Sequence, residues 1–158
     1  MGARRAEAGG GSHVRLWFVL RSLSIRCVTR RLVILICDDD AMMRELIATT
    51  LRHEQFEVIV TDNGADAVTL AAQHRPDLVL MDFVMPGSLA GLDALEELAE
   101  RDIAPVAMLT ALDDDRDRDR AARRGAIAFL NKAESMEGLG ARVRKVLADQ
   151  AGRGGEQR

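Results

Sequence analysis

The segment Leu32-Val-Ile-Leu-Ile-Cys37 is followed directly by Asp38-Asp-Asp40, so a run of apolar residues ends in three carboxylates. A continuous apolar run of this length, rich in branched side chains, is typical of a strand buried on both faces of a parallel sheet. The pattern returns at Asp77-Leu-Val-Leu-Met81, which is followed by Asp82. The two segments predict parallel strands whose carboxyl ends carry acidic groups.

Apolar runs and amphipathic segments alternate on both sides of these segments. The predicted strands are 32–37, 56–61, 77–81, 105–110 and 126–130. The predicted helices are 41–53, 63–74, 91–101, 114–124 and 135–149, with Asp40 placed to cap the first of them. Strands that alternate with helices predict a parallel sheet covered on both faces, and right-handed crossovers make it doubly wound. We therefore predict an α/β fold, with five parallel strands and five helices, over residues 32–149.

Charge divides the chain into parts of opposite sign. The formal net charge of −3 combines +6 in residues 1–31, −10 in residues 32–149 and +1 in residues 150–158. A region this acidic is unsuited to nucleic acid, whose phosphates need a basic surface. No apolar stretch approaches the ~20 residues that span a bilayer, so we expect a cytoplasmic protein without membrane insertion. Cys37 ends an apolar run, which favours a buried thiol.

The two ends of the chain differ from the region between them. Residues 1–31 are basic and contain Gly9-Gly-Gly11, and residues 150–158 are polar. We expect both ends to be disordered. Residues 1–31 are either a flexible basic arm or an extension that arises from a misplaced start or from added sequence. We favour the second interpretation, with Val28 as the initiating residue, and the mass of the native protein would decide.

Reactive side chains follow the predicted strands. Asp38–Asp40 come after the first strand, Asp82 after the third, Thr110-Ala111 at the end of the fourth, and Lys132 after the fifth. In doubly wound sheets, ligands bind beyond the carboxyl ends of the strands. Crowded carboxylates repel one another, and Mg²⁺ relieves this repulsion because it prefers oxygen ligands. We therefore expect a site where Mg²⁺ and Lys132 support attack of a carboxylate on phosphorus.

Four segments resemble the receiver domain of two-component response regulators. They are 32–40, 76–86, 106–111 and 125–132, and they agree with that family in order, spacing and placement at strand ends. The resemblance implies a flavodoxin-like receiver fold and a single-domain response regulator. Such a protein accepts a phosphoryl group on Asp82 from a histidine kinase or a histidine phosphotransfer protein. It is not an enzyme in the usual sense, because it catalyses only its own phosphorylation and slow dephosphorylation.

The resemblance also assigns roles to single residues. Asp38 and Asp39 would bind Mg²⁺ together with the carboxylate of Asp82 and the carbonyl of Val84.

At the phosphoryl group, Thr110 would close on it, the amide of Ala111 would donate to it and Lys132 would pair with it. Phe129 matches the aromatic residue whose rotamer follows Thr110. The fourth helix, fifth strand and fifth helix would bind an unidentified target protein. Because only a polar tail follows residue 149, we expect signalling through protein contacts.

Two local departures from the family pattern affect the site. The loop 86–91 is one residue longer than the commonest version and has Ala90 in place of aspartate. Ala133 follows Lys132, where receivers usually have a proline after a cis bond. A cis bond before a non-proline residue costs ~2.5–4 kcal/mol. We therefore predict a trans Lys132–Ala133 bond and a slightly different aim of Lys132.

Further departures concern the lifetime of the phosphorylated state and the helices that would bind the target protein. Val84 and Leu112 are apolar at two positions that tune hydrolysis in the family, which predicts a long-lived phosphorylated state. The helix 114–124 has almost no apolar stripe, and its i,i+3 ion pairs contribute only ~0.2–0.5 kcal/mol each. We expect it to be loosely docked. Gly138 and Gly140 are expected to weaken the start of the last helix.

Two alternatives remain. One is a binding module with a receiver fold that works without phosphorylation, which Ala90 and Ala133 permit. The other is a haloacid-dehalogenase-like phosphatase, which needs an Asp-x-Asp-x-Thr/Val pattern after the first strand. Here the sequence continues from Asp38-Asp-Asp40 into Ala41-Met42, so that pattern fails at its last position.

Overall fold

The structure, a computed structural model, describes residues 30–85, 91–111, 114–134 and 136–154. The expectations for residues 1–29, for the loop 86–90 with Ala90, and for Leu112 therefore lie outside the described residues.

Five parallel strands form one sheet in the described part of the chain. They are β1 (Val33–Cys37), β2 (Glu57–Thr61), β3 (Leu78–Asp82), β4 (Val106–Thr110) and β5 (Ala128–Asn131). Their spatial order is β2-β1-β3-β4-β5, so the direction of winding reverses between β1 and β3. This is the flavodoxin-like order, in which the switch point lies beside the first strand. The predicted fold class is confirmed.

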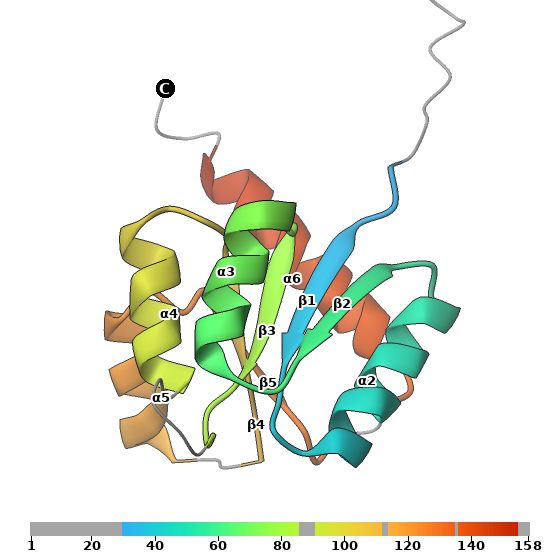
Figure 1. The fold of residues 1–158 in the computed structure, drawn as a ribbon, viewed down its shortest axis with the longest axis horizontal. Helices are drawn as coiled ribbons and strands as arrows, with labels where there is room; N and C mark the ends of the chain where they lie inside the picture. Colours follow the sequence, from blue (N-terminus) through green and yellow to red (C-terminus); the bar gives the residue numbers. More distant parts are fainter. Residues whose placement is uncertain (1–29, 86–90, 112–113, 135, 155–158) are drawn as a thin grey trace, which may run out of the picture. The chain divides into compact units, whose positions relative to one another are not determined.

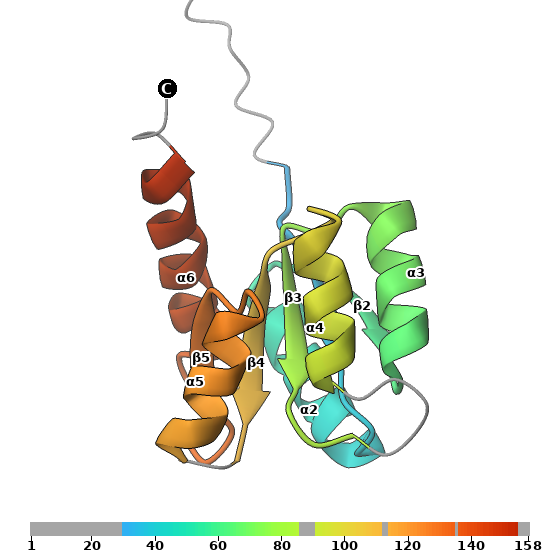
Figure 2. The ribbon, with the colours of Figure 1, turned by 90° about the vertical axis from the view of Figure 1, so that its left-hand side faces the viewer.

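Helices cover both faces of the sheet (Figure 1). They are α2 (Ala41–His53), α3 (Gly64–His74), α4 (Gly91–Glu100), α5 (Asp115–Arg123) and α6 (Leu139–Gly154). Buried residues of α2 and α6 pack on one face, and those of α3, α4 and α5 pack on the other. Figure 2 shows β3 and β4 running toward the same lower edge, so the carboxyl ends of the strands share one side of the molecule.

Side chains of β1 illustrate why the sheet is stable between these layers. Ile34 and Ile36 join the core under α2 and α6, whereas Leu35 and Cys37 join the core under α3 and α4. All four are fully buried, and burying one aliphatic side chain of this size stabilises a fold by about 1.5–3 kcal/mol. Cys37 is a free, buried cysteine, as expected.

The last helix differs from its predicted bounds at both ends. It begins at Leu139 rather than at residue 135 because Gly138 has a φ of 79°, which lies outside the helical region. It ends at Gly154, so the predicted boundary of the polar tail after Asp149 is wrong by five residues. Gly138 therefore stands before the helix and does not weaken its interior.

Helix α6 is tied to the end of α2. Glu54 Oε1 accepts a hydrogen bond from the Gly140 amide at 3.0 Å, and Arg144 Nη2 donates to the Glu54 carbonyl at 2.6 Å. The Arg144 guanidinium also lies 4.3 Å from the centre of the Phe56 ring. A Cβ atom at position 140 would collide with the Glu54 carboxylate, so glycine at this position makes the contact between α2 and α6 possible.

Helix α5 is attached to the fold more sparsely. Ala121 is its buried residue, and Asp114 caps it by accepting from the Arg116 amide at 2.9 Å. Just after the helix, Arg124 pairs with Asp93 of α4 at 3.0 Å. The near absence of apolar contacts agrees with the weak stripe in its sequence.

Candidate functional site

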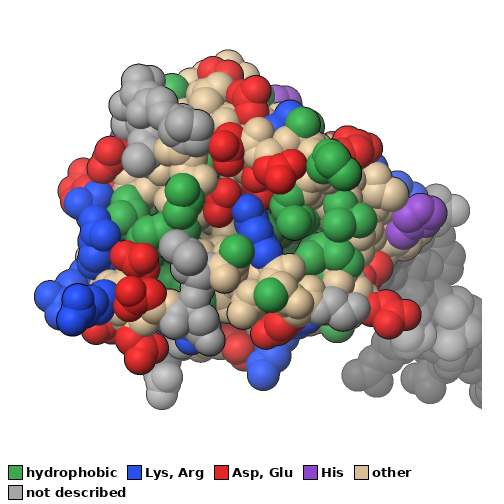
Figure 3. All heavy atoms as spheres, turned by 90° about the horizontal axis from the view of Figure 1, so that it is seen from below, with side chains coloured by type: hydrophobic (Ala, Val, Ile, Leu, Met, Phe, Trp, Pro, Cys, Tyr) green, Lys and Arg blue, Asp and Glu red, His purple; other side chains and the backbone are tan. Residues whose placement is uncertain are grey.

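Carboxylates gather where β1 and β3 end. Asp38 follows β1, and Asp82 is the last residue of β3. Oxygen atoms of Asp38, Asp39 and Asp82 lie within 4.8 Å of one another. Figure 3 looks onto this edge and shows acidic side chains around a basic one, with hydrophobic side chains beside them. The structure thus brings together three of the four predicted metal ligands.

Asp38 is held from several sides and is only 1% exposed. Its Oδ1 accepts from the Asp40 amide at 2.9 Å, and its own amide donates to the Thr61 carbonyl at 3.2 Å. Arg44 Nη1 donates to the Asp38 carbonyl at 2.6 Å. Asp39 beside it is exposed, so one carboxylate of the group is fixed and the other faces solvent.

Lys132 joins the two buried carboxylates. Its Nζ lies 2.6 Å from Asp38 Oδ2 and 2.9 Å from Asp82 Oδ2. Burial alone would lower the pKa of Lys132, but the hydrogen bonds and charges of Asp38 and Asp82 together raise that pKa. The ammonium therefore stays charged throughout the physiological pH range.

The pKa of Asp82 is raised, mainly because the carboxylate is buried. A hydrogen bond from Lys132 and another from the Val84 amide lower this pKa but do not offset the burial. By formal charge, the ammonium of Lys132 stands against the three carboxylates of Asp38, Asp39 and Asp82. Because the donors are hard oxygen atoms and their formal charge is negative, these residues fit a divalent cation such as Mg²⁺.

Three further predicted site residues lie on, or directly after, the two strands beyond β3. Thr110 is the buried last residue of β4, and Ala111 follows it at an exposed position. Phe129 lies in β5 opposite Met108 and is partly buried against the core.

Val84 adjoins the site through its backbone, while its side chain is 59% exposed. Gly91 lies against the backbone of Asp82, because a Cβ atom there would collide with the Asp82 carbonyl oxygen. Helix α4 can therefore begin directly against the backbone of Asp82.

The Lys132–Ala133 peptide bond is trans, as predicted, because the described residues contain no cis peptide bond. Lys132 nevertheless reaches both carboxylates. Strand pairing alone does not explain how the Lys132 side chain is directed at them, because β5 ends one residue earlier, at Asn131.

Two residues near the site were missed from the sequence. Arg44 supports the Asp38 carbonyl, and the Asn131 side chain accepts from the Ala133 amide at 2.8 Å. An arginine in the first turns of a helix and an asparagine at a strand end are common, so the sequence carries no distinctive signal for either.

A sulfur contact lies beneath the carboxylates. The Cys37 thiol approaches Met85 Sδ at 3.5 Å. Burial, reinforced by the charge of Asp38, raises the pKa of this thiol to about 12. The thiol therefore contributes packing and is not a nucleophile at neutral pH.

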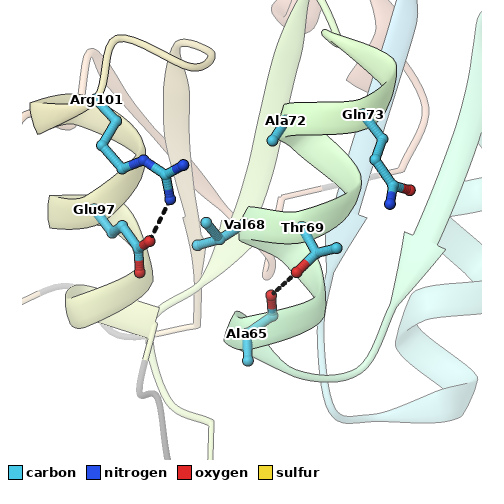
Figure 4. Close-up of a pocket in the computed structure, with 7 residues that line it drawn as sticks. All are labelled: Ala65, Val68, Thr69, Ala72, Gln73, Glu97 and Arg101. Carbon is cyan, nitrogen blue, oxygen red and sulfur yellow. Dashed lines mark hydrogen bonds and ion pairs between the residues drawn. The ribbon is translucent and has the colours of Figure 1, made fainter.

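A separate hollow of about 550 Å³ lies between α3 and α4 (Figure 4). Residues 65–73 of α3 contribute one wall, and the Glu97–Arg101 ion pair of α4, at 2.6 Å, lines the other. None of the predicted site residues lines it, so its position is independent of the acidic edge.

A family model described as the response regulator receiver domain matches residues 34–144. The transcriptional regulatory protein PdtaR of Mycobacterium tuberculosis is 41% identical over 107 residues, which cover 67% of this chain and 52% of that protein. The DNA-binding response regulator MtrA of Mycobacterium tuberculosis is 38% identical over 116 residues, 73% of this chain and 50% of that protein. The chain thus spans about half the length of these relatives.

Solved receiver domains have the same fold. The signal receiver domain of the putative response regulator NarL from Mycobacterium tuberculosis matches with a TM-score of 0.70 and 25% identity, covering 75% of this chain and 97% of that one. The BeF3-activated N-terminal receiver domain of Klebsiella pneumoniae RstA matches with a TM-score of 0.68 and 31% identity, covering 73% and 97%. No helix among the described residues has the length and apolar character needed to cross a membrane.

Proposed function

The chain belongs to the response regulator receiver family, and from this premise we propose that it accepts a phosphoryl group on Asp82 and signals by binding other proteins. The observation that carries the proposal is the pairing of Lys132 with both Asp38 and Asp82, at 2.6 and 2.9 Å, beside the exposed carboxylate of Asp39. Three carboxylates and one ammonium at the switch point form a site for phosphoryl chemistry.

The acidic residues would hold the metal ion. Asp38, Asp39 and Asp82, with the carbonyl of Val84, would bind Mg²⁺, which neutralises negative charge on the attacking carboxylate and the phosphoryl oxygens. Burial raises the pKa of Asp82, and a bound cation would favour its charged form.

The transfer step uses groups already present at this edge. An Asp82 oxygen attacks phosphorus of a phosphohistidine, the new P–O bond forms, the P–N bond breaks, and the histidine nitrogen keeps the electron pair. Lys132 then shifts from the carboxylate to a phosphoryl oxygen. Thr110 and the Ala111 amide would donate to the other oxygens, and the Phe129 side chain would change its rotamer when Thr110 moves.

Exposed apolar side chains around the acidic edge suit a protein donor. Met42 and Leu46 of α2 are 85% and 48% exposed, Val60 lies near the end of β2, and Val84 follows β3. Apolar groups that share one edge favour docking of a partner. We assign this edge to a histidine kinase or phosphotransfer protein, and the α5, β5 and α6 surface to the target protein.

Incubation with acetyl phosphate and Mg²⁺ tests the proposal. We expect wild-type protein to gain the mass of one phosphoryl group and Asp82→Asn to gain none. Asp62→Asn is the matched control, because Asp62 is an exposed aspartate that follows the neighbouring strand β2. Wild-type protein that stays unmodified and does not bind beryllofluoride would support the alternative of a phosphorylation-independent binding module.

The lifetime of the phosphorylated state gives a second test. Val84 presents an apolar side chain beside Asp82 and cannot orient a water molecule for attack. We propose that purified phosphoprotein loses its label slowly and that Val84→Asn accelerates the loss. Equal rates for the two proteins would contradict this role of Val84.

A further inference from the structure

The turn that carries Lys132 has its own hydrogen-bond pattern. The Lys132 amide donates to the Thr110 carbonyl at 2.8 Å, which is the last sheet-like bond along this strand. The Glu134 amide donates back to the Asn131 carbonyl at 3.3 Å, closing a four-residue turn. The backbone therefore leaves the sheet at the residue whose side chain must reach the site.

Asn131 bridges this turn with its side chain. Its Oδ1 accepts from the Ala133 amide at 2.8 Å, and its carbonyl accepts from the Glu134 amide. Asn131 therefore fixes the backbone that follows Lys132 with two hydrogen bonds. An asparagine that bonds the amide two residues ahead is a known way to fix a turn. Ala133 is exposed and offers only a methyl group, so apolar packing contributes little to fixing this bend.

Lys132 needs such support because its side chain is long. Four carbon atoms separate its backbone from an ammonium that must reach two carboxylates at once, at 2.6 and 2.9 Å. A flexible stem delivers its charge accurately only when its starting point and direction are fixed.

We propose that Asn131 is a positioning residue that aims Lys132 at Asp38 and Asp82 through the Ala133 amide. Its effect on phosphoryl transfer rests on the proposed function, whereas its effect on the placement of Lys132 does not. A side chain without an acceptor at position 131 should therefore release the ammonium from the carboxylates even in the unphosphorylated protein.

The first test observes the ammonium group directly. Lys132 and Lys145 are the only lysines of the chain, and Lys145 is exposed, so lysine side chains labelled with ¹⁵N give signals that are easily assigned. We expect a solvent-protected ammonium signal for Lys132 in wild type and in Asn131→Ser. We expect Asn131→Ala and Asn131→Leu to lose that protection, and an unchanged signal in both would overturn the proposal.

The second test measures phosphorylation by acetyl phosphate at saturating Mg²⁺. Asn131→Leu should slow the reaction roughly 10-fold, because small misplacements of a reacting charge are costly. Asn131→Ser should retain most of the rate, because a hydroxyl forms the same turn bond more weakly. If Asn131→Leu does not fold, the comparison of Asn131→Ala with Asn131→Ser decides, and equal rates for those two would overturn the proposal.

Asn63 provides the matched control. Its Oδ1 accepts from the Asp66 amide at 2.9 Å at the start of α3, so Asn63→Ala removes the same kind of bond away from Lys132. We expect Asn63→Ala to leave the ammonium signal and the rate unchanged. An equal effect of both asparagine variants would mean that general stability is responsible, and the proposal would fail.

The two proposals fail separately. If wild-type protein is not phosphorylated, the proposed function fails and the ammonium signal still tests Asn131. If wild type is phosphorylated and Asn131→Leu matches it in rate and signal, only the role of Asn131 is overturned.

Discussion

Helices α5 and α6 lie on opposite faces of the sheet, one before β5 and one after it, and they are held by different forces. Helix α6 contributes the fully buried Leu139 and Val143 to the core and is tied to α2 through Glu54. Helix α5 buries Ala121 and is anchored just beyond its end by ion pairs of Arg124 with α4. Exposed ion pairs contribute about 0–1 kcal/mol, so α5 costs far less to displace. If Asp82 is phosphorylated as proposed, a signal that reaches these helices would displace α5 at a lower cost than α6.

The largest effect should come from Lys132, which precedes α6. Lys132→Met leaves the carboxylates of Asp38 and Asp82 buried without their cation, and removing one partner of such a group costs about 3–5 kcal/mol. On α5, Arg120 pairs with Asp117 in a largely exposed position, and Arg120→Ala should cost less than about 0.5 kcal/mol. Urea unfolding at neutral pH without Mg²⁺ measures both. Similar losses of unfolding free energy in the two variants would show that Lys132 stabilises the fold no more than an exposed arginine of α5.

Raising the pH should remove the stabilisation that the charge of Lys132 provides. The folded protein holds the Lys132 proton more tightly than the unfolded chain, because its pKa is raised above 10.5. Its contribution is complete below pH 10.5 and is lost as the pH rises through the raised pKa. The difference in unfolding free energy between wild type and Lys132→Met should therefore shrink above pH 10.5. A difference that stays constant with pH would contradict the pairing of Lys132 with the carboxylates.

Two further mutations compare how strongly buried side chains hold each helix. Leu139→Ala removes a fully buried side chain of α6 and should cost about 3 kcal/mol. Ala121→Gly at the buried position of α5 should cost about 1 kcal/mol, mainly through lost helix propensity. Chemical denaturation of both variants measures the ratio. A larger loss for Ala121→Gly would show that α5 is the better anchored helix.

The tie between α2 and α6 should have a smaller effect. Glu54→Ala removes the acceptor of the Gly140 amide and one partner of Arg144, with an expected cost of about 1–2 kcal/mol. Glu54→Gln keeps an oxygen acceptor and should lose less than half of that. Equal losses in thermal unfolding would indicate that the charge, and not the amide bond, holds α6.

The smallest change in stability should accompany a local change in motion. Arg124→Ala removes the ion pairs with Asp93 and Glu96 and should cost less than about 0.5 kcal/mol. Hydrogen exchange of amides in residues 115–123 should nevertheless become faster, while exchange in α6 stays the same. Faster exchange in both helices would mean that the two are coupled.

The order of the elements and the acidic edge of the sheet follow from the sequence, because apolar runs mark strands that are buried on both faces. Their ends are less predictable. Phe56 belongs to the apolar run before β2 and is buried, yet its amide bonds back to the Leu51 carbonyl at the end of α2. Burial and strand pairing are different properties, and a hydrophobic pattern reports only the first.

Contacts between distant side chains were not predictable. Gly140 was expected to weaken its helix, but the structure shows that it makes room for Glu54, 86 residues away in the chain. The bond from Ala133 to Asn131 is local, yet asparagine has many uses at the end of a strand. Such bonds depend on where the backbone has already been placed, which periodicity does not encode.

Gly91 has a consequence for how such a sequence diverges. Any side chain at this position would meet the Asp82 carbonyl oxygen, so a viable substitution there requires a compensating shift of α4 or β3. A residue added or removed before Gly91 needs no such shift, as long as a glycine still occupies the start of α4. We therefore expect related sequences to differ in length before this position more often than they replace the glycine itself.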